Sequence, residues 1–175
     1  MTILIIIAIV IAIPLILAIF TKKDYAIERQ ITINRPKQDI FNYIKYLKNQ
    51  DNFSKWAKMD PDMKKDYSGT DGTPGFVARW DSPKKDVGKG EQEIIKITEG
   101  EKVELAIHFI KPFEGRANAQ LSTTATGSDQ TRVTWSLQSK MAYPMNIMLL
   151  FLNMEKMIGN DLEIGLGNLK ELMEK

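Results

Sequence analysis

The spacing of hydrophobic residues changes its period several times along this chain. Residues 25–33 alternate apolar and polar positions, which predicts a half-buried β-strand. A short helix should follow, because Asn34 is a candidate cap and Pro36 stands where a helix opens. An apolar stripe over residues 40–47 fits that helix. A loop-rich passage then runs from Asn49 to Asp62.

From Phe76 onwards the period is two, which predicts a series of β-strands. Turn signals rich in glycine, proline and aspartate separate the runs. Strands that follow one another through short turns predict an antiparallel meander with one packed face and one wet face. The positions expected on strand faces are Phe76, Ala78 and Trp80; Ile95 and Ile97; Val103, Leu105, Ile107 and Phe109; Ala117, Ala119, Leu121 and Thr123; and Val133, Trp135 and Leu137.

A helical stripe closes the chain from about Met145 to Glu174. Its apolar residues recur every three or four positions: Ile147, Leu150, Met154, Ile158, Leu162, Leu166, Leu169 and Met173. A long helix along a curved antiparallel sheet of about six to seven strands is an α+β architecture. Where such a sheet wraps its helix incompletely, an apolar cavity lies between them.

The first residues have a different character, because no charge occurs between Ile3 and Phe20 and two lysines follow. As a helix this stretch would reach about 27 Å, close to the roughly 30 Å of a bilayer's hydrocarbon core. A cleaved signal peptide fits less well, since no basic residue precedes Ile3 and no A-x-A-like site follows. We therefore expect residues 1–21 to be a transmembrane anchor and residues 24–175 to be one domain. The lysines would leave that domain on the cytoplasmic side of a single-pass membrane protein.

Composition narrows the chemistry. The 24 basic and 22 acidic residues nearly cancel, so no strong field points to a nucleic-acid partner. The absence of cysteine excludes disulfides and thiolate metal sites. Asp60, Asp62 and Asp66 lack the spacing of a calcium loop, and no glycine motif for phosphate is present. We expect neither a metal nor a cofactor.

The sequence nominates no catalytic residue. His108 is the single histidine, and it alternates with Ile107 and Phe109, so it should face away from the apolar side. A serine or cysteine nucleophile is poorly supported, because there is no elbow motif and no cysteine.

Arg29 shares strand parity with Ile27 and Ile31, which aims it inward. A buried arginine needs a carboxylate or a bound anion. Either Arg29 snorkels at the edge of the sheet, or it lies inward and orients the polar head of a ligand. Glu104 and Glu93 are alternative partners for it.

Several motifs resemble, in order and spacing, the helix-grip fold of the SRPBCC superfamily. The resemblance covers nearly all of residues 25–174 and is strongest to the polyketide cyclase/dehydrase-like branch; other members are START lipid-transfer domains and pollen-allergen ligand carriers. The motifs are Ile31-Thr32-Ile33-Asn34-Arg35-Pro36 with Ile40-Phe41, Trp56 before Asp60-Pro61, Tyr67-Ser68-Gly69-Thr70, Gly88-Lys89-Gly90-Glu91, Phe109-Ile110-Lys111-Pro112-Phe113, Thr131-Arg132-Val133-Thr134-Trp135 and Gly165-Leu166-Gly167-Asn168-Leu169-Lys170.

The resemblance implies a module that binds a lipid or another hydrophobic small molecule between the sheet and the long helix. The expected N-terminal anchor departs from typical soluble members of the superfamily and would tie this module to the membrane. Methionine-rich apolar linings adapt to varied ligands. The candidate ligand-binding residues are Arg29, Phe53, Trp56, Phe76, Trp80, Phe109, Trp135, Met154, Met157 and Ile158. A cyclase/dehydratase-type enzyme is one alternative, and it would need an acid–base pair within about 3 Å of a common point. The other is a chaperone-like or protein-interaction domain with a filled core and an exposed apolar patch.

Overall fold

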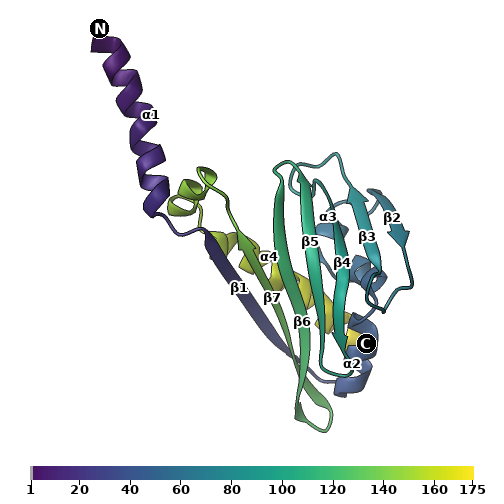
Figure 1. The fold of residues 1–175 in the computed structure, drawn as a ribbon. Coiled ribbons are helices and arrows are strands. Elements are labelled where there is room, and N and C mark those ends of the chain that lie inside the picture. The colour runs from purple at the N-terminus through teal and green to yellow at the C-terminus, as the bar shows by residue number, and fades with distance from the viewer. Residues whose placement is uncertain (1) are drawn as a thin grey trace.

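The computed structural model describes the backbone of residues 2–175, together with the side chains of Ile3 and of residues 10–175. Part of the predicted membrane segment, namely Met1 and the side chains of Thr2 and residues 4–9, lies outside the described residues. The first helix, α1 (Thr2–Phe20), projects from one end of a domain made of a single sheet and several helices (Figure 1).

The sheet is antiparallel, with seven strands in the order β1-β7-β6-β5-β4-β3-β2. β2 to β7 form the predicted meander, and β1 closes it by pairing with β7 from Asp24↔Lys140 to Ile33↔Thr131. The strands are β1 (Asp24–Ile33), β2 (Lys64–Ser68), β3 (Val77–Asp81), β4 (Lys89–Thr98), β5 (Lys102–Lys111), β6 (Gly115–Gly127) and β7 (Gln130–Lys140).

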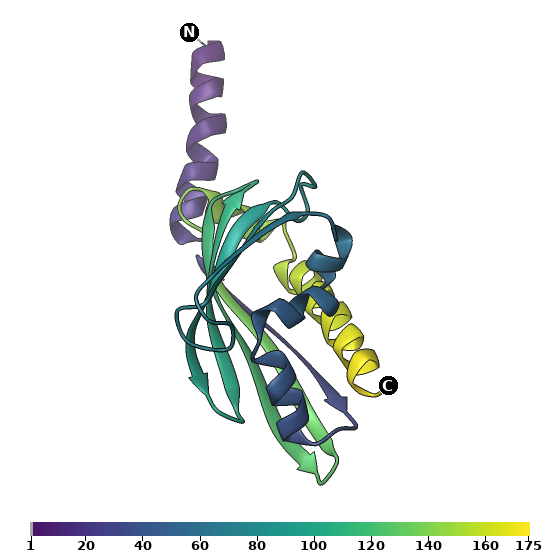
Figure 2. The ribbon, with the colours of Figure 1, turned by 90° about the vertical axis from the view of Figure 1, so that its right-hand side faces the viewer.

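The helices between β1 and β2 lie on one face of the sheet, with the C-terminal helix α4 (Met154–Met173) lying along the same face (Figure 2). This arrangement confirms the predicted α+β helix-grip fold. The shorter helices are α2 (Lys37–Ile44), the 3-10 helix η1 (Leu47–Asn52), α3 (Lys55–Met59) and the 3-10 helix η2 (Met145–Leu150).

The closing helix is shorter than predicted, because the stripe that begins at Met145 is divided between η2 and α4. The side chain of Asn153 caps α4 by accepting a hydrogen bond of 2.9 Å from the backbone N–H of Lys156. Such a cap satisfies an N–H group that would have no partner inside the helix, so α4 starts there. The apolar side chains of η2 therefore do not extend the stripe of α4.

The predicted membrane anchor is corrected by the structure. Within the part of the chain that is described, no helix has the length and apolar character needed to cross a membrane. The described side chains of α1 form a continuous run from Val10 to Phe20, which rises about 16 Å as a helix, whereas a hydrocarbon core is about 30 Å thick. The predictions of a transmembrane segment over residues 1–21 and of a single-pass membrane protein were wrong.

The C-terminal end of α1 is fixed to η2 by one side chain. Asn146 is fully buried, and its Nδ2 donates to the carbonyl oxygens of Ala18 at 2.7 Å and Thr21 at 2.9 Å. The last carbonyls of a helix have no partner within it, so this amide both caps α1 and ties it to the segment that precedes α4.

A β-bulge explains why one predicted strand face was wrong. The pairing of β4 with β5 shifts register between Ile94 and Lys96. As a result Ile94 is fully buried, Ile95 is 49% exposed, and Ile97 returns to the packed face. A bulge adds one residue to one strand, which a strict alternation of two cannot anticipate.

The core consists of two clusters of buried side chains. One lies between α4, α2, β1 and β7 and includes Phe53 and Trp135; the other lies over β3 to β6 and includes Phe41 and Phe76. In the first cluster α4 approaches the sheet closely at Gly165, where an added Cβ would lie 2.8 Å from Cζ3 of the buried Trp135. The missing side chain thus makes room for the indole ring.

Two glycines in the same helix provide a test of this close approach. Gly165→Ala should lower the free energy of unfolding by about 1–3 kcal/mol, because the overpacked indole must shift within a dense core. Gly167→Ala should raise it by up to about 1 kcal/mol through helix propensity, since a Cβ there meets nothing within 4 Å. Urea unfolding of the full-length chain, followed by circular dichroism, measures both. Equal stabilisation by the two changes would contradict the close contact.

Candidate ligand-binding site

Aromatic side chains form a wall on the helix-bearing face of β3 to β5. Trp80 pairs across the strands with Gly90, and Gly90 pairs with Phe109. The rings of Trp80 and Phe109 meet edge to face, with centroids 6.3 Å apart. A Cβ at Gly90 would lie 2.6 Å from Cζ2 of Trp80, so the indole lies directly over that glycine. We call Trp80, Gly90, Ile107 and Phe109 the aromatic wall.

The aromatic wall is less buried than the rest of that face. Ile94 and Leu105, one step further along the same strands, are fully buried, whereas Trp80, Ile107 and Phe109 are half-buried. The reason is the course of α4, whose main strand contacts are with β1. Figure 1 shows α4 running obliquely behind the sheet, from β1 and β7 at its start toward the lower ends of β5 and β4, while β3 lies further to the side. The wall therefore lies beside the helix rather than under it.

The structure divides the candidate ligand-binding residues into groups. Phe53 and Trp135 are buried in the first core cluster, and Trp56, Met154 and Ile158 pack against it. Trp56 and Phe53 both meet Trp135 edge to face. Phe76 is buried in the second cluster. Trp80 and Phe109 form the wall, and Met157 on α4 is 53% exposed. Their role in ligand binding stays a prediction.

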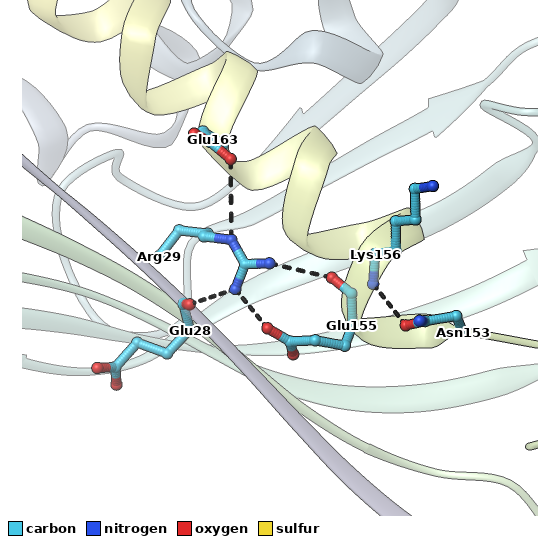
Figure 3. A network of polar contacts seen from close by, with 6 residues as sticks. All are labelled: Glu28, Arg29, Asn153, Glu155, Lys156 and Glu163. Carbon is cyan, nitrogen blue, oxygen red and sulfur yellow. Dashed lines mark hydrogen bonds and ion pairs between the residues drawn. The ribbon is translucent and has the colours of Figure 1, made fainter.

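Arg29 reaches from β1 to the N-terminal half of α4 (Figure 3). Its Nη1 donates to Oε1 of Glu155 at 2.6 Å and to the carbonyl oxygen of Glu28 at 2.8 Å, and its Nη2 donates to the carbonyl oxygen of Glu155 at 3.1 Å. Glu163 lies 4.0 Å from Nε. The side chain keeps 26% of its surface exposed.

These contacts show which groups pair with the charged guanidinium group of Arg29. It points to the helix side of the sheet, as its strand parity predicted, but its partners are on α4 and not Glu104 or Glu93. The backbone of α4 can come this close because residue 159 is glycine; a Cβ there would overlap the guanidinium group. Arg29 is therefore an ionic clamp between β1 and α4.

Two surface hollows lie elsewhere. One of about 530 Å³ is lined by the ends of β1, β6 and β7, and one of about 390 Å³ lies beside α2 and the end of α4. Neither is lined by any of the candidate ligand-binding residues.

The one histidine is not part of the wall. Nδ1 of His108 lies 3.8 Å from Oε1 of Glu91, and its Nε2 lies 3.4 Å from Oε1 of Glu114. It alternates along β5 with Ile107 and Phe109, so it belongs to the opposite face of the sheet. Within the described residues, no group of three or more His, Asp or Glu side chains could hold a metal ion.

A titratable cluster borders the wall at the edge of the sheet. Lys65 on β2 lies opposite Trp80 and pairs with Asp51 at 2.9 Å. The hydroxyl of Tyr67 donates to the same carboxylate at 3.0 Å, and its ring stacks on Phe76. Burial, together with the Asp51 charge, raises the pKa of Tyr67 to about 12. The sequence did not single out this cluster, because its members lie on separate segments.

Comparison with known proteins agrees with the fold. The sequence profile of the family described as polyketide cyclase/dehydrase and lipid transport matches residues 25–174. No curated protein gives a significant match to the chain.

Solved structures with the same fold are distant in sequence. Norcoclaurine synthase from Thalictrum flavum, in complex with dopamine and hydroxybenzaldehyde, is 11% identical, with a TM-score of 0.63 over 87% of this chain and 88% of that chain. A protein from Nitrosospira multiformis is 16% identical, with a TM-score of 0.58 over 85% and 96%. A protein from Chromobacterium violaceum is 10% identical, with a TM-score of 0.59 over 86% and 97%. The family match over residues 25–174 confirms the predicted SRPBCC-type superfamily, and these structures agree with its fold.

A double-mutant cycle tests the clamp between Arg29 and Gly159. In the native chain Gly159→Ala should leave the free energy of unfolding nearly unchanged, because its Cβ displaces the guanidinium group from Glu155 and offsets the gain in helix propensity. In an Arg29→Ala background the same change should stabilise by up to about 1 kcal/mol, the helix propensity of alanine over glycine. The difference between the two backgrounds is a coupling energy of up to about 1 kcal/mol, which urea unfolding measures. Additive effects would mean that the two residues do not meet.

Tyr67 provides a test by pH titration. Because its pKa is raised in the folded state, the neutral phenol is the form that folding favours. The stability it contributes is complete below about pH 10, the unperturbed value, and is lost as the pH rises through about 12. The absorbance at 295 nm of the native chain minus that of Tyr67→Phe should titrate with a midpoint near 12. A midpoint near 10, with circular dichroism reporting a folded chain, would contradict the assigned environment.

Proposed function

Because the chain belongs to the polyketide cyclase/dehydrase and lipid transport family, we propose that it binds a hydrophobic small molecule between the aromatic wall and the N-terminal half of α4. The observation that carries this proposal is the half-buried pair of Trp80 and Phe109 on the inner face of the sheet. Large aromatic side chains on such a face are ordinarily covered, and each Å² of apolar surface removed from water contributes about 25 cal/mol. A bound apolar molecule would supply that cover.

The side chains in the N-terminal half of α4 suit an adaptable site. Met154 and Ile158 pack at the margin of the first core cluster, and Met157 is 53% exposed. Methionine is flexible and fills irregular spaces, so these residues can move aside for a ligand and close when it leaves. This property fits candidate residues that line neither of the two surface hollows.

The norcoclaurine synthase structure, which contains dopamine and hydroxybenzaldehyde, supports a ligand of small aromatic size for this fold. Its low sequence identity limits the likeness to the fold. The proposed ligand class is therefore an apolar molecule with a ring or a short chain. Because the family description names lipid transport, the class also includes molecules with longer chains.

Binding is favoured over acid–base catalysis by the titratable groups beside the wall. Lys65 and Asp51 neutralise one another in an ion pair. The pKa of Tyr67 is raised by burial to about 12, far from the neutral range in which a general acid or base works best. A cyclase or dehydratase would need a pair poised near neutral pH, and this cluster does not supply one.

The proposal predicts a specific loss of affinity. The neutral apolar dye N-phenyl-1-naphthylamine should bind the full-length chain, with quenching of tryptophan fluorescence. Phe109→Ala should weaken binding by about tenfold to a hundredfold, because a large part of the apolar contact is lost. Phe113→Ala is the matched control, since Phe113 is 76% exposed in the turn after β5 and should leave the affinity unchanged.

Two results would overturn the proposal. The first is a dye that fails to bind the native chain. The second is a dye that binds Phe109→Ala as tightly as the native chain, while circular dichroism shows both proteins to be folded.

A further inference from the structure

A polar side chain stands unpaired next to the aromatic wall. Gln50, on η1, is 7% exposed, and its Oε1 accepts a hydrogen bond of 3.1 Å from Nε2 of Gln92. Within the described part of the chain, Nε2 of Gln50 has no hydrogen-bond partner. An unmade hydrogen bond on a buried group is costly, so this amide is positioned to donate to something else.

The sheet register places this pair beside the wall. Gln92 lies between Ala78 and Ile107 across the strands, one step from the row of Trp80, Gly90 and Phe109. It is half-buried on the same face of the sheet as these residues. The amide of Gln50 thus lies at the inner end of the wall, where the half-buried row gives way to the fully buried Ile94.

We propose that Gln50, held in place by Gln92, is the polar anchor of the ligand site, and that the ligand carries a hydrogen-bond acceptor oxygen at its inner end. This inference rests on the proposed binding function. The class that fits is a neutral apolar molecule with a ketone, ester or aldehyde oxygen. A carboxylate is disfavoured, because the anchor is an uncharged amide and no cation lies within hydrogen-bond distance of it.

The arrangement also explains the orientation of the ligand. Apolar surface would lie along Trp80 and Phe109, toward the open end of the wall, and the oxygen would lie at Gln50. A ligand oxygen that accepts a hydrogen bond from the Gln50 amide satisfies both groups when they are buried. A hydrocarbon at the same place leaves the amide without a partner. The site should therefore distinguish a carbonyl compound from a hydrocarbon of the same shape.

A pair of probes of similar shape tests this discrimination. 2-Acetylnaphthalene carries one carbonyl oxygen, and 2-ethylnaphthalene lacks it. In competition with N-phenyl-1-naphthylamine on the full-length chain, Gln50→Leu should weaken the ketone by about tenfold and leave the hydrocarbon unchanged; tenfold corresponds to about 1.4 kcal/mol. Gln30→Leu, on the exposed outer face of β1 and outside both hollows, is the matched control and should change neither affinity.

A second variant guards against a folding defect. Gln50→Met nearly keeps the length and volume of the side chain and removes both donors without burying a charge, so it should lose the ketone preference. The urea midpoint of each variant reports folding independently of ligand.

The outcomes separate the two proposals. Suppose that both probes bind the native chain, and that the Gln50 variants lower both affinities equally or lower neither. The proposed anchor is then overturned, and the proposed binding site stands. If neither probe binds the native chain, the proposed function fails, and the anchor fails with it.

Discussion

The close approach of α4 to β1 and β7 determines how the rest of this domain is arranged. Two glycines on one side of the helix make it possible: Gly165 receives the ring of Trp135, and Gly159 receives the guanidinium group of Arg29. A side chain at either place would hold the helix away from the sheet. Since Arg29 also bonds the Glu155 carboxylate and backbone, the N-terminal half of α4 is fixed by packing and charge together.

This constraint has a consequence for the strands nearer the opposite edge of the same face of the sheet. A helix held against β1 and β7 cannot also cover β3 to β5, where Trp80 and Phe109 remain half-buried. The short helices α2 and α3 with η1 complete the cover only in part. The aromatic wall and, through Gln92, the unpaired amide of Gln50 lie in the region that results. The part of the domain around β1 and β7 is thus tightly packed under α4, whereas the part around β3 to β5 is loosely covered.

Much of this fold could be predicted from the sequence, because its strands alternate regularly and its helices carry clear stripes. The inward direction of Arg29 followed from strand parity with Ile27 and Ile31. Its partner Glu155 could not be predicted, since 126 positions separate the two residues and only the docking of α4 brings them together. Ile95 was misplaced because a bulge interrupts the alternation.

The site was less accessible from sequence than the fold. Trp80 and Phe109 were among the candidates, but so were Phe53 and Trp135, which the structure buries in the core. Composition cannot separate aromatic residues that pack under the helix from those that lie beside it. Gln50 had no signal at all, because a glutamine in a polar loop becomes informative only when its burial is known.

The most direct test of this account follows the three tryptophans through their indole N–H signals in a nuclear magnetic resonance titration. Single Trp→Phe variants assign the signals, and N-phenyl-1-naphthylamine is added to the ¹⁵N-labelled full-length chain. The account predicts that the signal of Trp80 shifts most, while that of Trp135, enclosed by Gly165, Phe53 and Trp56, shifts little. A shift confined to Trp135, or no shift at saturating dye, would contradict a ligand site at the aromatic wall.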